Sequence, residues 1–205
     1  AFITPSTDPH SGEYVPAHWE SRKWISGFTG SAGTVVITTS QGGLWTDSRY
    51  FLQAAEQLQG SGLTLFKDRL PETPDIPSWL GQVLTPGDKV GIDGWVTTTA
   101  EAQSLKTALA QNGLELISVE DPYESLWKDR PALPMNAPFI LPLTYCGTDS
   151  TTKIEKIRQQ IRANQADGML VSALDEIAWT LNMRGNDVHC NPVFVSYLLI
   201  TEQRT

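Results

Sequence analysis

Three evenly spaced glycines stand between residues 27 and 33, in the stretch GFTGSAG. Glycine-rich loops often hold phosphate groups, but that chemistry needs a strand before the glycines and the N-terminus of a helix after them. Here the order is reversed, because PAHWESRKWISGF is typical of a short helix and the β-branched run 34–38 is typical of a strand. The spacing G-x-x-G-x-x-G also matches neither nucleotide-binding template. The pattern therefore favours a helix-to-strand connection over a phosphate site.

Two further groups of side chains have the chemistry of metal ligands. Asp8, His10 and Glu13 lie close together in DPHSGE, and His189 directly precedes Cys190. Three ligands in one turn are too few for two metal ions, and a turn stabilised by hydrogen bonds of the Asp8 side chain explains the first group. An adjacent pair is a weak signal for the second. We expect this chain to bind no metal or other cofactor.

Composition limits the classes of function. The chain has 205 residues, of which 40% are hydrophobic, and a formal net charge of -8 without a cluster of Lys or Arg, so we expect a globular protein that does not bind nucleic acid. No run approaches the roughly 20 apolar residues that span a bilayer, so we expect no membrane association. Cys146 and Cys190 lie far apart and lack metal-ligand spacing, which favours reduced thiols and a cytoplasmic location.

Strand and helix patterns alternate along the first part of the chain, which indicates an α/β fold. Within it we expect a hairpin that turns at Gly42 and Gly43. The proline-rich run 131–142 predicts a linker between a first domain, 1–130, and the start of a second, 143–205. A helix is expected to follow the hairpin, with one apolar face made by Phe51, Leu52, Ala55 and Leu58.

The second domain echoes the first. GMLVSALD is followed by a Trp-bearing helix, a glycine and the apolar stretch NPVFVSYLLIT, in the same order as AFITPSTD, its Trp-bearing helix, the glycine loop and TVVIT. Such a repeat predicts that both domains begin with the same arrangement of strand, helix and strand. It also predicts that the chain ends inside the second sheet, which leaves an apolar edge near FVSYLLI.

Four stretches carry a resemblance to a known family: PSTDPHSGEYVPAHWESRKWISGFTGSAGTVVIT, LWTDSRYFLQAAEQ, SLWKDRP and ALDEIAWTLNMRGNDVHCNPVFVSYLLIT. Together they resemble the amino-terminal region of the Xaa-Pro aminopeptidases, also called aminopeptidase P. The resemblance implies a creatinase-type domain I over 1–130, with a mixed sheet flanked by helices, and the truncated start of a similar domain II over 143–205. It also implies that the catalytic pita-bread domain, with two divalent ions, expected to be manganese, is absent from this chain.

The family resemblance implies a function for the parent protein. Xaa-Pro aminopeptidases are hydrolases that release an N-terminal residue preceding proline, so the expected partners are peptides with proline at the second position and, through domain I, a second copy of the chain. This part is then expected to shape the substrate entrance and the dimer interface, and to be inactive alone. The alternative is a non-enzymatic protein-interaction module of creatinase-like fold.

One residue is assigned a role by the resemblance. Arg49 matches the arginine of the family word TDxRY, which is associated with peptide binding, and Asp47 is its expected orienting partner. A guanidinium fork is suited to holding a peptide carbonyl or carboxylate. The other interpretation remains open, that Arg49 pairs with Asp47 only to fix the junction between the hairpin and the helix.

Overall fold

The computed structural model describes residues 1–205, which divide into two compact units. Unit 1 comprises residues 1–11 and 19–130, and unit 2 comprises residues 12–18 and 131–205. None of the helices combines the length and the apolar character that a membrane span requires.

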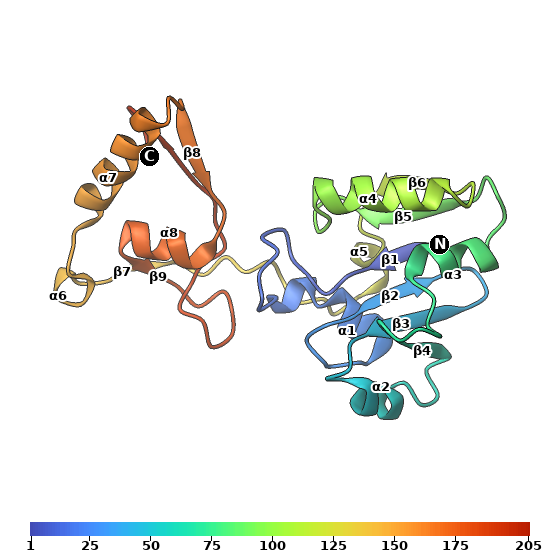
Figure 1. Ribbon diagram of the computed structural model, residues 1–205. Coiled ribbons are helices and arrows are strands. Elements are labelled where there is room, and N and C mark those ends of the chain that lie inside the picture. Colours follow the sequence, from blue (N-terminus) through green and yellow to red (C-terminus); the bar gives the residue numbers. More distant parts are fainter. The chain divides into compact units, whose positions relative to one another are not determined.

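Unit 1 is built on a six-stranded sheet with the strand order β4-β3-β2-β1-β5-β6 (Figure 1). Strand β2 is antiparallel to β1 and β3, whereas the pairs β3–β4, β1–β5 and β5–β6 are parallel. The predicted mixed sheet flanked by helices is therefore confirmed, and the carboxyl ends of β1, β3, β4, β5 and β6 meet at one edge. The strands are β1 (Phe2–Thr4), β2 (Thr34–Ile37), β3 (Gly42–Thr46), β4 (Leu63–Lys67), β5 (Lys89–Asp93) and β6 (Glu115–Val119).

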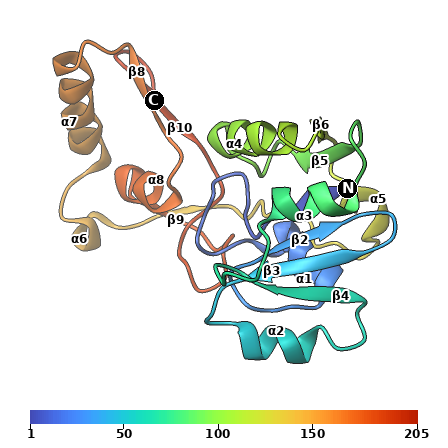
Figure 2. The same ribbon diagram turned by 45° about the vertical axis from the view of Figure 1, so that its right-hand side comes forward.

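Helices cover both faces of this sheet, with α3 and α4 on one side and α1 and α2 on the other (Figure 2). Because side chains alternate along a strand, Val36 and Trp45 pack with α3 and α4, whereas their neighbours Val35 and Leu44 pack toward α2. The helices are η1 (Ala17–Trp19), α1 (Ser21–Ser26), α2 (Phe51–Gln57), α3 (Ile76–Val83), α4 (Thr99–Ala110) and α5 (Tyr123–Leu126).

Local sequence signals set the ends of these helices. Thr98 and Glu101 form a reciprocal capping box at the start of α4, and the Asp75 side chain accepts the Ser78 N–H at the start of α3. Helix α1 ends at Gly27, whose φ of 69° is a left-handed conformation that favours glycine. The loop 27–33 thus connects a helix to a strand, which confirms the interpretation preferred over a phosphate site.

Two details of the sequence prediction were wrong. The hairpin turns at residues 38–41, and Gly42 and Gly43 are instead the first residues of β3, where the Phe66 ring covers Gly43. In α2, Leu52 is 90% exposed, because the buried face follows the i, i+4 pair Ala54 and Leu58.

Unit 2 has a smaller core between two helices and a two-stranded sheet. Strands β8 and β10 pair antiparallel, and the short strand β7, inside the predicted linker, pairs with β9. Ile161 of α7 and Ile177 of α8 pack there with Ile200 of β10. The elements are β7 (Phe139–Ile140), α6 (Leu143–Cys146), α7 (Ser150–Ala163), β8 (Gly168–Val171), α8 (Leu174–Leu181), β9 (Met183–Arg184) and β10 (Leu198–Thr201).

The order of elements at the start of the two sheets is the same. In unit 1, β1 leads through α1 to β2, which returns antiparallel to β1. In unit 2, β8 leads through α8 to β10, which returns antiparallel to β8. The predicted repeat of strand, helix and strand is therefore present.

Candidate functional site

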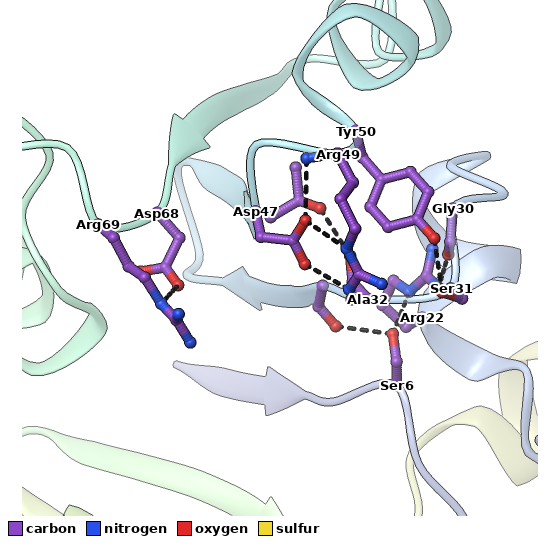
Figure 3. Close-up of polar contacts among 12 residues, drawn as sticks. Ser6, Arg22, Gly30, Ser31, Ala32, Asp47, Arg49, Tyr50, Asp68 and Arg69 are labelled. Atoms are coloured by element: carbon purple, nitrogen blue, oxygen red, sulfur yellow. Dashed lines mark hydrogen bonds and ion pairs between the residues drawn. The ribbon is translucent and has the colours of Figure 1, made fainter. Parts of the chain in front are cut away.

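The stretch TDSRY forms a tight turn between β3 and α2. The Tyr50 N–H donates to the Asp47 carbonyl over 3.0 Å, and the Arg49 N–H donates to Asp47 Oδ1 over 3.0 Å. The Arg49 side chain then folds back on the same carboxylate, with Nε 2.9 Å from Oδ1 and Nη2 2.7 Å from Oδ2. Asp47 therefore holds Arg49 through its backbone and through a two-point contact with its guanidinium (Figure 3).

The two charges stabilise each other at the surface. The Arg49 side chain is 65% exposed and that of Asp47 is 27% exposed. The hydrogen bond from Arg49 is the main cause that lowers the pKa of Asp47 below its usual value, and the same bond raises the pKa of Arg49. Arg49 also lies over the Tyr50 ring, 5.2 Å from its centroid. The Arg49 guanidinium is therefore exposed, and its orientation is fixed by the Asp47 carboxylate and by the Tyr50 ring.

Tyr50 links this turn to the glycine loop. Its hydroxyl lies 2.6 Å from the Ser31 hydroxyl, and this hydrogen bond is the main cause that lowers the pKa of Tyr50. The Thr46 hydroxyl donates to the Ala32 carbonyl over 2.6 Å. Figure 3 shows the Tyr50 ring extending toward Ser31, while the Arg49 side chain lies against Asp47.

Arg22, which is only 6% exposed, holds the other side of the loop. Its guanidinium donates to the carbonyls of Phe28 and Gly30 and to the Ser6 hydroxyl, and Ser6 in turn donates to the Gly33 carbonyl. Burial lowers the pKa of Arg22 from its usual value to about 10. The loop therefore directs carbonyl oxygens to protein donors, whereas a phosphate cradle presents N–H groups.

The other candidate groups do not bring a set of metal ligands together. The His10 N–H donates to Asp8 Oδ1 over 3.1 Å and the Ser11 N–H donates to the Asp8 carbonyl, so this segment is the predicted polar turn. His189 and Cys190 are exposed, and Cys146 and Cys190 are both free thiols. No three residues of the types His, Cys, Asp and Glu converge in a way that would hold a metal ion.

Sequence reasoning found Asp47 and Arg49, and the structure brings the two side chains together. It missed Arg22, Ser6 and Ser31, which are far from Arg49 in the sequence and belong to no chemical motif. The position of Arg22 in the short helix that precedes the glycine loop was the only available signal.

Fold and sequence define the class of this protein: the chain belongs to the creatinase/prolidase N-terminal domain family. One model of that family matches residues 4–126 and a second matches residues 129–205.

Within this class the chain is similar to the amino-terminal part of Xaa-Pro aminopeptidases, which confirms the resemblance read from the sequence. It is 42% identical over 203 residues to Xaa-Pro aminopeptidase ApepP of Drosophila melanogaster, covering 98% of this chain and 33% of that protein. It is 41% identical to aminopeptidase P2 of Arabidopsis thaliana, covering 98% of this chain and 28% of that protein.

A solved structure agrees with these relatives. X-prolyl aminopeptidase of Caenorhabditis elegans, described as a cytosolic enzyme with a di-nuclear active site, superposes with a TM-score of 0.87 at 32% identity. The match covers 98% of this chain and 33% of that one. The chain thus spans about a third of the length of these proteins. A two-metal centre does not fit its own residues, since no set of ligands converges.

Proposed function

We propose that this chain is the non-catalytic amino-terminal part of a metal-dependent Xaa-Pro aminopeptidase, which releases an N-terminal residue preceding proline. The observation that carries the proposal is the match of 98% of the chain to about a third of such enzymes at above 40% identity. The catalytic pita-bread domain, with two divalent ions, in our proposal manganese, lies in the remaining two thirds. Residues 1–130 are then domain I, 131–142 a linker and 143–205 the start of domain II.

Arg49 is the residue of this chain that we propose to contact the substrate. Asp47 uses only the Nε and Nη2 positions of the guanidinium, which leaves the two N–H groups of Nη1 as donors for a peptide carbonyl or carboxylate. A donor that is already oriented loses less conformational entropy on binding. In this proposal domain I shapes the entrance to the active site with Arg49, and Asp47 acts as a positioning residue.

Two further elements belong to the proposal. Domain I forms the interface of a homodimer, and the protein works in the cytoplasm, which the description of the nematode structure as cytosolic supports. Trp45 is excluded from the dimer interface, because it is buried and its Nε1 donates to the Pro74 carbonyl.

The assay for Arg49 is hydrolysis of Ala-Pro-Ala by the full-length protein. A hydrogen bond from a charged group contributes about 1.5–3 kcal/mol, so Arg49→Ala is expected to lower kcat/KM about 10- to 100-fold. Arg49→Lys is expected to recover only part of this loss, because an ammonium group cannot donate through the same fork. Asp47→Asn tests the positioning role and is expected to lower kcat/KM less than Arg49→Ala.

Arg162→Ala is the matched control. Like Arg49, Arg162 is an exposed arginine that forms ion pairs. Its partners are Glu155 and Glu202, and it lies in unit 2, on α7. The kcat/KM of the Arg162→Ala variant is expected to stay at the wild-type value. Equal kcat/KM for Arg49→Ala and this control, in proteins of equal stability, would leave Arg49 with the structural role of closing the turn. Absence of hydrolysis by the full-length protein would favour the protein-interaction module instead.

A further inference from the structure

A groove of about 820 Å³ lies on unit 1, at the edge of the sheet where the parallel strands end. Its walls come from the ends of β1, β3 and β5, from the first turn of α3 and from one face of α4 between Ala100 and Ala108. Open α/β sheets bind their ligands outside the carboxyl ends of the strands, and pockets of this volume hold small ligands or part of a peptide. The floor is apolar and is made by Ile3, Trp45, Ile76, Ile92, Val96 and Leu105.

The charges around this groove are mostly negative. Four carboxylates line it, from Asp47, Asp68, Asp75 and Glu101, and the only cation among the lining residues is Arg69. The Arg69 side chain is 88% exposed and its Nε lies 3.6 Å from Asp68 Oδ2. Such an exposed pair is weak, and Arg49 pairs with Asp47, so the excess negative charge of the groove comes mainly from Asp75 and Glu101.

The carboxylates keep acceptor capacity for a ligand. Asp75 and Glu101 each bind donors of their own helix N-terminus, through Asp75 Oδ1 and Glu101 Oε2. A carboxylate offers about four lone-pair sites, so these bonds do not saturate it. A ligand that suits both the apolar floor and the carboxylates of the groove carries apolar groups and a positive charge.

We propose that this groove binds the tail of the peptide substrate, beyond the residue that follows the proline, and selects tails that combine apolar side chains with lysine or arginine. This inference rests on the proposed function. The groove is continuous with the proposed substrate contact, since Asp47 lines it and the same carboxylate holds Arg49. A peptide bound at Arg49 therefore lies next to a residue that lines the groove.

The experiment compares KM values of the full-length protein for Ala-Pro-Ala, Ala-Pro-Ala-Leu-Lys and Ala-Pro-Ala-Leu-Glu. At low ionic strength we expect KM for the lysine peptide to be about fivefold below that for the glutamate peptide, from a few weak ionic contacts. The difference is expected to shrink in 1 M NaCl, where the Debye length falls to about 3 Å. Asp68→Asn is expected to reduce the preference about twofold without changing KM for Ala-Pro-Ala.

Two exposed residues of α4 supply a matched pair of blocking variants. Ser104 lines the groove, whereas the adjacent Gln103 does not. Ser104→Trp is expected to raise KM about fivefold for the lysine peptide, since it removes both the apolar and the ionic contacts. Gln103→Trp is expected to have the wild-type KM for the lysine peptide. Both variants are expected to have the wild-type KM for Ala-Pro-Ala.

The outcomes separate the two proposals. Hydrolysis of all three peptides with equal KM, or a Ser104→Trp variant with unchanged KM for the lysine peptide, would overturn the groove proposal and leave the proposed function intact. No hydrolysis of Ala-Pro-Ala would overturn the proposed function itself. A change of oligomeric state of Ser104→Trp in sedimentation, with KM for the lysine peptide unchanged, would identify the groove as a contact between copies and overturn the peptide proposal.

Discussion

Replacing Arg22 by methionine tests the idea that this side chain holds the glycine loop. Methionine keeps most of the apolar stem but removes every donor, so the buried carbonyls of Phe28 and Gly30 lose the guanidinium. A buried polar group without its partner costs about 1–3 kcal/mol, which gives about 2–6 kcal/mol for the two carbonyls. Burial of the Arg22 cation, which lowers its pKa to about 10, destabilises the wild type. Because methionine removes this desolvation cost, part of the loss is offset. We therefore expect Arg22→Met to lower the free energy of unfolding by about 3 kcal/mol.

Urea unfolding of the 205-residue chain, followed by tryptophan fluorescence, measures this change. The signal reports mainly on unit 1, because Trp179 alone lies in unit 2. Arg69→Met is the control, since Arg69 is exposed, and it is expected to change the free energy of unfolding by less than about 0.5 kcal/mol. The tryptophans of unit 1 are Trp19, Trp24, Trp45, Trp79, Trp95 and Trp127.

Arg22→Lys refines the test. A lysine keeps the charge but offers a single nitrogen, which cannot reach all three acceptors that the guanidinium binds. The free energy of unfolding of Arg22→Lys is expected to lie between those of the wild type and Arg22→Met. A cost below about 1 kcal/mol for Arg22→Met would refute the reasoning, because it would show that desolvation of the cation cancels its hydrogen bonds.

Three further predictions concern stability. Lys153→Met is expected to cost about 2 kcal/mol in urea unfolding, because the buried Nζ donates to the Trp179 carbonyl and to Asn182 Oδ1 at the end of α8; an unchanged transition in far-UV circular dichroism would contradict this. Thr98→Ala removes the capping box of α4 and is expected to cost about 1 kcal/mol, with Thr107→Ala as a control inside the same helix. Burial is the main cause that raises the pKa of Asp93 above 3.8, so its ionised form opposes folding and this cost disappears as the pH falls through the raised pKa. Asp93→Asn, which keeps an acceptor for the Trp95 N–H, is thus expected to stabilise the chain at pH 7 and not at pH 3, as compared by thermal unfolding.

The sequence predicted the elements whose signals are local. The short helix before the glycine loop and the β-branched strand after it were both found at nearly the correct residues. Gly42 and Gly43 misled the prediction, because glycine marks a turn in isolation, whereas here the Phe66 ring of a neighbouring strand covers Gly43. Only the tertiary structure contains that information.

The same distinction applies to the site. Asp47 and Arg49 are two residues apart, so their pairing was accessible from a short motif. Arg22 contacts residues of the glycine loop and Ser6, and nothing in the sequence indicates which carbonyls it binds. The groove was also missed, since its floor is drawn from strands and helices that alternate along unit 1, and an apolar residue such as Ile92 looks like any other core residue.

The most direct test of the account compares hydrolysis of Ala-Pro-Ala by the full-length protein and by the chain of residues 1–205, each with Mn²⁺ at equal concentration. The account predicts release of alanine by the full-length protein and none by the isolated chain, whose residues offer no converging set of metal ligands. Release of alanine by the isolated chain at a comparable rate would contradict it, because the catalytic centre would then have to lie among the residues described above.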